Sequence, residues 1–449
     1  MKPIATILAA TLLTTAATHA IDITEWRGEG RRGVFAKEKN LIDDWKAQQP
    51  KVLWANEELG DTYASVTIVG DKIFTTGITR YDTEEDDPKV EGKKKQDYDG
   101  REFLYALDKK DGKLLWSLHY GESCAGKDPR GRQYPAARST PTYADGHLYT
   151  VSGAGDIACV TLDGKLVWRA HISKDFGSLS SSRDWGWAIS PVVHDGKVIF
   201  TIASPEAAMI ALDAKTGKKV WATEPLSGKA AYASPALIEK NGKKQIVGMT
   251  DDWMFGVDPA TGKIEWTFGL KQLEQLGEGG APGHFSSWSI TPVLEGNKIV
   301  SSGGYHIGAF AVTVNDKLDA AEFAWIVPDL DAQYLHPVVA DGTMWTVASK
   351  KPLIAAIDIA TGKIIWQSEG VAKGASLTAA DGMLYCCHEW GKFELLEMNK
   401  KEYVHRGQLA GVKGSMMTRP STNWSHPVIA DGVLYVRYGN ALTAFDVRK

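Results

Sequence analysis

Cysteine is scarce in this chain, and four cysteines are too few for the disulfide framework on which small secreted folds depend. Basic residues show no excess either, because 51 lysines and arginines stand against 55 aspartates and glutamates. This balance gives no support for a nucleic-acid-binding surface. After residue 20, no apolar run approaches the ~18 residues that a membrane-spanning helix requires.

Short catalytic motifs are also missing. The sequence contains neither a Gly-x-Ser-x-Gly elbow nor a His-Glu-x-x-His zinc motif. The glycine-rich stretch 277–283 lacks the Lys-Ser/Thr pair that completes a phosphate-binding loop. Common hydrolase, metalloprotease and nucleotide-binding sites are therefore not indicated.

The first 20 residues, MKPIATILAATLLTTAATHA, differ from the rest of the chain. They combine Lys2, an apolar run without acids, and small residues ending at Ala20. We interpret residues 1–20 as a secretory signal peptide cleaved after Ala20, rather than as a buried strand or helix. The protein is then exported to the periplasm or the extracellular space. The residue directly after the cleavage point is Ile21 and not the lipobox cysteine that a lipid anchor requires, so we expect no lipid anchor.

Glycine (45 residues) and tryptophan (16 residues) are abundant and spread along the chain. Both belong to a recurring pattern: a strand, a turn ending in Gly, and a second strand ending in tryptophan, which is a β-hairpin. It occurs at 105–116, 159–168, 210–221, 255–266 and 355–366. The second-strand anchors recur every roughly 40 to 60 residues and are Trp54, Trp116, Trp168, Trp221, Trp266, Trp325, Trp366 and, in a degraded unit, Tyr403.

A second hairpin, turning at Asp-Gly, precedes most of these units, as in 139–153, 189–202, 335–348 and 425–438. Two hairpins make a four-stranded antiparallel unit, A-B-C-D, typical of a β-propeller blade. The fold class predicted is therefore all-β, an eight-bladed β-propeller over residues 51–449. Residues 51–54 have the D-strand pattern and should close the ring by pairing with the C-terminal blade, which removes two exposed edges.

The hairpin consensus Ala-x-Asp-x-x-Thr-Gly-Lys-x-x-Trp, best carried by 211–221 and 356–366, resembles the repeat of the PQQ-like, or quinoprotein-type, β-propeller family. The resemblance covers nearly all of the chain after residue 20. The opening WRGEGRRG, residues 26–33, also resembles the start of a secreted bacterial subgroup of that family. The superfamily includes dehydrogenases and assembly scaffolds, so the resemblance implies fold more than function.

The two faces of such a ring should differ. A-to-B and C-to-D turns emerge on one face, which we name the turn face, and they are short here. The long connections 78–101, 119–138, 171–187, 268–287 and 405–424 emerge on the other, the loop face. Because sites usually lie on long loops held by a rigid scaffold, we expect function on the loop face. Residues 21–50 form an extension that should pack on the propeller, on a face that the sequence does not decide.

Candidate ligand-binding residues gather at the predicted loop-face funnel. Histidines and aromatic residues near the starts of inner strands suit a planar or anionic ligand, with arginine supplying charge. The alternative for each is a structural loop residue. The candidate residues are Arg138, Trp187, Tyr232, Trp288, His306, His336, His388 and His426.

The function best indicated is a non-catalytic binding or scaffold protein, with a protein, glycan or small-molecule ligand at the funnel. We expect a monomer, with no nucleic-acid partner and no assigned metal. The family resemblance implies two alternatives. One is a quinoprotein alcohol dehydrogenase holding PQQ with calcium, although no carboxylate–asparagine ligand set can be matched here. The other is an outer-membrane protein assembly scaffold.

The stretch YCCHEW, residues 385–390, contains adjacent cysteines. Quinoprotein alcohol dehydrogenases have a disulfide between adjacent cysteines, which is one interpretation of Cys386 and Cys387. Aligning the repeats instead places both inside a B strand, where neighbouring side chains point to opposite sides. We therefore expect two packed thiols. His388 occupies a position that other blades fill with small residues, and it should reach the loop face.

Overall fold

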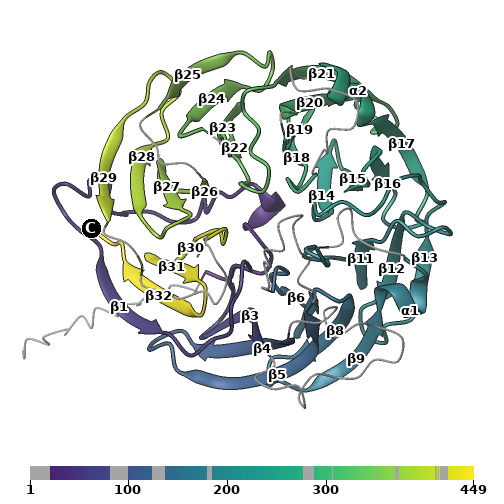
Figure 1. The fold of residues 1–449 in the computed structure, drawn as a ribbon, viewed down its shortest axis with the longest axis horizontal. Coiled ribbons are helices and arrows are strands. Elements are labelled where there is room, and N and C mark those ends of the chain that lie inside the picture. Colours follow the sequence, from purple (N-terminus) through teal and green to yellow (C-terminus); the bar gives the residue numbers. More distant parts are fainter. Residues whose placement is uncertain are drawn as a thin grey trace, which may run out of the picture.

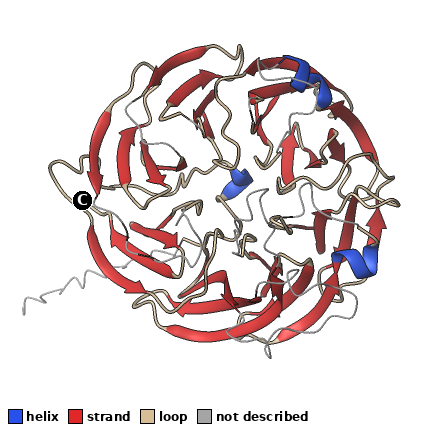
Figure 2. Ribbon diagram, in the orientation of Figure 1, coloured by secondary structure: helices blue, strands red, loops and turns tan. Residues whose placement is uncertain are grey.

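The computed structural model describes residues 21–80, 100–123, 137–178, 185–276, 288–305, 307–349, 351–369, 374–409, 412, 414 and 423–449. These residues form eight four-stranded antiparallel sheets arranged around a central axis (Figure 1). Figure 2 shows strands throughout the ring, with few and short helices. The predicted all-β, eight-bladed propeller is confirmed.

The blades follow the chain in order. Blade 1 is β2 (Thr67–Val69), β3 (Lys72–Arg80), β4 (Gly100–Asp108) and β5 (Leu114–Ser123); blade 2 is β6 (Thr142–Ala144), β7 (His147–Val151), β8 (Asp156–Thr161) and β9 (Leu166–His171). Blade 3 is β10 (Val192–His194), β11 (Lys197–Thr201), β12 (Met209–Asp213) and β13 (Lys219–Ala222); blade 4 is β14 (Ala236–Lys240), β15 (Lys243–Met249), β16 (Trp253–Val257) and β17 (Ile264–Gly269).

Blade 5 is β18 (Val293–Glu295), β19 (Lys298–Gly303), β20 (Gly308–Val314) and β21 (Ala321–Val327); blade 6 is β22 (Val338–Ala340), β23 (Thr343–Val347), β24 (Ile354–Asp358) and β25 (Ile364–Ser368). Blade 7 is β26 (Ala375–Ala380), β27 (Met383–His388), β28 (Phe393–Glu397) and β29 (His405–Leu409); blade 8 is β30 (Val428–Ala430), β31 (Val433–Tyr438), β32 (Ala441–Asp446) and β1 (Lys51–Asn56). The short helices are η1 (Glu29–Arg31), α1 (Ile172–Phe176) and α2 (Lys271–Leu276).

The ring closes as predicted. Strand β1, from the N-terminal part of the chain, pairs antiparallel with β32 and becomes the outer strand of blade 8. Because the first and last strands hydrogen-bond within one blade, the closure joins the two ends of the propeller through backbone contacts.

The recurring tryptophans connect neighbouring blades. In six blades the outer-strand indole Nε1 donates to a backbone carbonyl in the C-to-D turn region of the next blade, for example from Trp168 to Ala214 at 2.9 Å and from Trp325 to Ile359 at 2.8 Å. A Cβ added at Gly217 or Gly362, both at positive φ, would come within 2.7 or 2.5 Å of the indole of Trp168 or Trp325, respectively. The Gly and the Trp of the repeat are thus two sides of one inter-blade contact.

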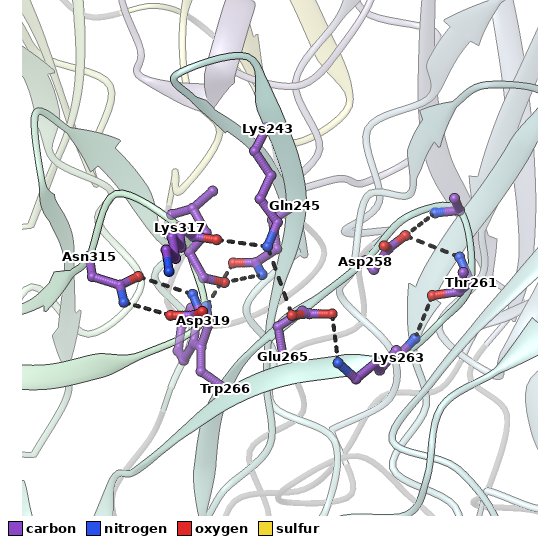
Figure 3. A network of polar contacts seen from close by, with 12 residues as sticks. Lys243, Gln245, Asp258, Thr261, Lys263, Glu265, Trp266, Asn315, Lys317 and Asp319 are labelled. Carbon is purple, nitrogen blue, oxygen red and sulfur yellow. Dashed lines mark hydrogen bonds and ion pairs between the residues drawn. The ribbon is translucent and has the colours of Figure 1, made fainter.

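Between blades 4 and 5 this contact is indirect, and it passes through Gln245 of β15 (Figure 3). Trp266 donates its Nε1 to Gln245 Oε1 at 2.7 Å, and Gln245 Nε2 donates to the Leu318 carbonyl at 2.9 Å. The buried Gln245 amide therefore links the tryptophan to the turn through two hydrogen bonds in place of one direct bond. Figure 3 also shows Lys263 and Glu265, an exposed ion pair at 3.2 Å, beside this relay.

The N-terminal extension crosses the turn face and enters the central channel. Glu38 accepts the backbone N–H groups of Asp431 and Gly432 in the A-to-B turn of blade 8, and the Leu41 N–H donates to Asp381 in the turn of blade 7. Ahead of these contacts, helix η1 lies at the centre of the ring (Figure 1). We name residues 23–35, which occupy the channel, the plug.

Arginines of the plug bind carbonyls of the inner strands. Arg27 donates to the carbonyls of Leu377 and Pro337, and Arg31 donates to those of Ser190 and Pro191. Inner strands present unpaired backbone groups to the channel, and a buried carbonyl without a donor is costly. The three arginines and three glycines of WRGEGRRG therefore pack the axis of the propeller.

The thiols of YCCHEW are packed separately, as the repeat alignment predicted. Cys386 and Cys387 are free and fully buried. Cys386 belongs to an apolar cluster with Trp345, whereas Cys387 belongs to a cluster with Trp45. The two side chains therefore point to opposite sides of β27.

Candidate ligand-binding site on the loop face

Polar side chains at the starts of inner strands link different blades around the axis. Each accepts a backbone N–H from another blade; we name this set the axial belt. Its bonds run from Ser65 N to Thr140 Oγ1, from Thr140 N to Ser190 Oγ, from Ser190 N to Ser234 Oγ, from Thr291 N to His336 Nε2, and from His336 N to His426 Nε2. The two predicted funnel histidines thus lie at the axis.

His336 and His426 are buried members of this belt, only 6% and 5% exposed. Each Nε2 accepts a backbone N–H, so that nitrogen carries no proton in the folded protein. Burial, followed by the charge of Arg27, lowers the pKa of both rings well below the ordinary value. The arrangement makes them neutral acceptors between blades.

Trp26 of the plug lies against both histidines. Its ring centroid is 4.5 Å from that of His336 and 5.7 Å from that of His426, in edge-on geometry. The Arg27 guanidinium lies 6.0 Å from the Trp26 ring centroid. The channel at this level is therefore filled by the chain's own indole and guanidinium.

Three side chains near the loop face form a second cluster around blades 2 to 4. Arg138 donates to the Trp185 carbonyl at 2.7 Å, the Trp185 N–H donates to the Tyr232 hydroxyl at 3.2 Å, and the Trp185 and Tyr232 rings stack at 6.3 Å. Two of the predicted residues, Arg138 and Tyr232, are thus brought together by Trp185.

Trp187 and Trp288 lie inside the protein. Trp187 is 5% exposed and its indole packs over Gly155. Trp288 is fully buried, donates Nε1 to the Asp251 carbonyl at 3.1 Å and meets Phe310 edge-on. Both rings pack beneath loop-face connections, and their faces are covered by other residues.

His388 is buried at the end of β27. Its Nε2 lies 3.3 Å from Oε2 of Glu394, and Lys392 contacts the other oxygen of that carboxylate at 2.8 Å. Burial raises the pKa of Glu394, but His388 and Lys392 outweigh it and lower that pKa to about 2. His306, the remaining predicted residue, lies outside the described residues.

An aromatic cluster with one carboxylate lies where blades 6, 7, 8 and 1 meet on the loop face. Tyr63 stacks on Trp424 at 4.6 Å, and Tyr334 packs on the same indole at 4.1 Å. The Tyr334 hydroxyl and the Trp424 indole N–H both donate to Glu389 Oε1 at 2.8 Å. Glu389 is therefore held in place by two donors from different connections.

Trp390 follows Glu389 and is 69% exposed, the highest value among the exposed large hydrophobic side chains of the described residues. Its backbone lies in a tight turn, in which the Gly391 N–H donates to the His388 carbonyl and the Glu389 N–H donates to the Gly374 carbonyl. An exposed indole on a fixed turn is an anchor of the kind found at protein interfaces. We name Glu389, Trp390, Tyr334, Trp424 and Tyr63 the loop-face patch.

Sequence reasoning selected some of these residues and missed others. Trp390 and Trp424 stand out as aromatics outside the repeat, and Glu389 follows His388 at the predicted loop-face end of its strand. Tyr63 and Tyr334 carry no such signal, because only the meeting of connections from several blades brings them to this cluster. The plug residues Trp26, Arg27 and Arg31 had a signal in the unusual arginine and glycine content of 26–33. That signal does not say where the segment lies.

The geometry defines a class: a closed propeller whose loop face carries an aromatic patch and whose channel is filled by its N-terminal extension. Residues 99–368 and 316–449 match the family described as outer membrane protein assembly factor BamB. This chain belongs to that PQQ-like β-propeller family, as its repeat predicted.

Relatives of known activity include dehydrogenases. The quinohemoprotein alcohol dehydrogenase ADH IIB of Pseudomonas putida is 26% identical over 203 residues, which is 39% of this chain and 28% of that enzyme. A 1-butanol dehydrogenase (quinone) of Thauera butanivorans is 30% identical over 166 residues, or 34% of this chain and 24% of that enzyme. The matched part thus spans less than a third of either relative.

Solved structures share the fold at low identity. BamB from Moraxella catarrhalis has a TM-score of 0.57 and 12% identity, covering 88% of this chain and 99% of that one. The quinohemoprotein alcohol dehydrogenase from Comamonas testosteroni has a TM-score of 0.64 and 11% identity, covering 95% and 80%. At such identities the likeness shows architecture alone.

The described residues do not fit a quinone with calcium. A flat cofactor requires an open ring face, whereas Trp187 and Trp288 are covered and Trp26 lies edge-on against two histidines. Possible oxygen ligands are engaged within the protein: Glu389 accepts from two side chains, and Asn423 Oδ1 accepts the Ser425 N–H. Within the described ranges, no three His, Cys, Asp or Glu side chains converge on a metal position.

Proposed function

We propose that this protein is an exported, non-catalytic PQQ-like propeller that binds a protein partner through its loop face. The observation that carries the proposal is the exposed Trp390, which directly follows Glu389, the carboxylate that Tyr334 and Trp424 hold in place. Interface energy concentrates in a few aromatic and arginine anchors on well-supported surfaces. The family description, an assembly factor, supports a role in holding other proteins.

The alternative is a quinoprotein alcohol dehydrogenase, which the partial identity to ADH IIB favours. An outer-membrane assembly scaffold is a narrower form of the main proposal, supported by the family match. In the part of the chain that the structure describes, no helix is long and apolar enough to span a membrane.

Photo-crosslinking at Trp390 tests the proposal. With benzoylphenylalanine at position 390 of the full chain in an exporting cell, irradiation should give a discrete heavier species that contains a second protein. The same group at Val220, which is 48% exposed on the outer strand β13, is the matched control and should give none. Equal products from both positions, or none from either, would contradict the proposed interface.

The dehydrogenase alternative is measured separately. Purified protein is titrated with pyrroloquinoline quinone and calcium, and dye-linked oxidation of primary alcohols is followed. We expect neither saturable quinone binding nor turnover. Saturable binding with turnover would replace the scaffold proposal by the enzyme one, whatever crosslinks form.

If the signal peptide is cleaved after Ala20, the new N-terminus at Ile21 should affect the stability of the fold. The Ile21 backbone nitrogen lies 3.0 Å from Asp431 Oδ1, a carboxylate that Lys109 also contacts. Cleavage after Ala20 would place a charged α-amino group there. A chain starting at Ile21 should therefore be more stable than one with an extra alanine before it, by about 1 kcal/mol for a part-exposed ion pair.

Urea denaturation at neutral pH measures that difference. Asp431→Asn in both chains is the control, and it should abolish the difference because the amide cannot pair with the ammonium. A difference that persists in Asp431→Asn, or its absence in the parent chain, would contradict docking of the new terminus at Asp431.

A further inference from the structure

The turn face carries a depression of 860 Å³ around the plug. One wall is formed by plug and extension residues, including Glu25, Glu29 and Arg32, and the other by inner strands of blades 2 to 7. This volume lies within the range of pockets that hold ligands of substantial size. It lies on the opposite face from the loop-face patch, so the inference below does not depend on the proposed function.

The inner strands that border the depression are edge strands. In each blade the innermost strand pairs on one side only, and its other edge faces the channel. The plug shows what these edges accept: Ile23 bridges antiparallel to Ile68 of β2, and Val34 bridges parallel to Ala379 of β26. An extended chain can therefore add to an inner strand in either direction.

The plug does not add to every blade. Among the described residues, its backbone hydrogen bonds reach inner strands of blades 1, 2, 6 and 7. At blade 3 it supplies the Arg31 guanidinium to the first carbonyls ahead of β10. Val192 and Val193 of β10 and Leu237 and Ile238 of β14 line the depression. Strands β10 and β14 thus border the depression, and helix η1 packs close to β14.

The depression is acidic in this sector. Its lining contains six carboxylates (Glu25, Glu29, Glu239, Glu295, Asp341 and Asp381) against three cations (Arg32, Lys39 and Lys400), and Arg32 is paired with Glu295. Two of the carboxylates have basic neighbours outside the lining: Glu25 lies 3.4 Å from Arg31, and Glu239 lies 3.9 Å from Lys244. Lys39 lies 4.0 Å from Asp381, and Lys400 donates to the Asp341 carbonyl. The excess of carboxylates over cations in the lining complements a cationic ligand.

We propose that this depression binds an extended, basic peptide segment of a partner protein, which adds as a strand to the inner edges of β10 and β14. Arginine or lysine side chains of the segment pair with Glu29 and Glu239, and alternate aliphatic side chains cover Val192 and Leu237. The plug already binds the channel in the way proposed for the peptide. Its arginines donate to carbonyls at the inner strands, and its Ile23 and Val34 form β-bridges to inner strands.

A fluorescein-labelled peptide of alternating arginine and valine is the probe, and fluorescence polarisation with the full mature chain is the measurement. We expect saturable binding that weakens as salt is raised. The double variant Glu29→Gln/Glu239→Gln should weaken it about tenfold, the sum expected of two exposed ion pairs. Glu322→Gln, an exposed acid on the outer strand β21, is the matched control and should leave it unchanged.

A second probe separates strand addition from charge alone. The same peptide with alternate backbone nitrogens methylated keeps every charge but cannot complete a strand ladder, so its binding should be lost. No saturable binding of the parent peptide, equal binding of the methylated one, or equal loss in Glu322→Gln and the double variant would each overturn the proposal. Circular dichroism of each variant confirms that the fold is retained.

Discussion

Replacing Arg27 with methionine is expected to lower the free energy of unfolding by about 3 kcal/mol. The guanidinium is 2% exposed and donates to the carbonyls of Leu377 and Pro337 in two different blades. Burial lowers the pKa of Arg27 to about 9, because a charged guanidinium is costly to remove from water. Methionine avoids this desolvation cost, which offsets part of the stability lost with the hydrogen bonds. Methionine fills similar volume but leaves both buried carbonyls without a donor.

Equilibrium urea denaturation measures this change. Lys37→Met, an exposed position in the same N-terminal extension, removes a cation without a buried partner and should change stability by less than about 0.5 kcal/mol. Similar stability of the Arg27 variant and the parent would show that the plug does not hold the blades together.

Acidification should destabilise the protein through His336 and His426. Burial and the neighbouring Arg27 lower the pKa of both rings well below 6.5, and Arg31 also opposes protonation of His336. Below pH 6.5 the unfolded chain therefore binds protons that the folded chain does not, and stability falls as pH falls. The expected loss is about 1.4 kcal/mol per pH unit for each histidine.

The double variant His336→Gln/His426→Gln isolates this contribution. Each glutamine keeps a side-chain acceptor but does not titrate. The glutamine at position 336 can accept the Thr291 N–H, and the glutamine at position 426 can accept the backbone N–H of residue 336. Urea denaturation at pH 5.5 and 7.5 should show a loss in the parent that exceeds that of the variant by about 2 to 3 kcal/mol. Equal losses would mean that the histidines do not stay neutral in the folded chain.

The loop-face site could be predicted only in part. The sequence located histidines and aromatics near inner-strand starts, and the structure places His336 and His426 at the axis. It also places Trp187, Trp288 and His388 in the interior, where they pack connections or pair with Glu394. The position of a residue along its strand indicates how far it lies from the propeller axis. Whether its side chain is exposed depends on which connections of other blades cover it.

The fold was determined by local rules that repeat. Turn residues at fixed offsets set each hairpin, and the Gly and Trp of the consensus set the contact between blades, so the blade count and the closure of β1 on β32 could be derived from the sequence. Even the exception between blades 4 and 5 follows the rule, because Gln245 accepts from Trp266 and donates to the Leu318 carbonyl in the turn of blade 5.

Tertiary structure alone decided what fills the axis and which face remains open. Nothing in residues 21–50 states that Arg27, 350 positions before Leu377, donates to its carbonyl. That contact exists because inner strands from all eight blades converge on one channel and leave carbonyls there. The loop-face patch likewise joins Tyr63 to Trp424, which only closure of the ring brings together. The local sequence determines each hairpin, because turn residues and strand patterns act over a few residues. A site built from several blades depends instead on the closed ring, because only the ring brings their connections together.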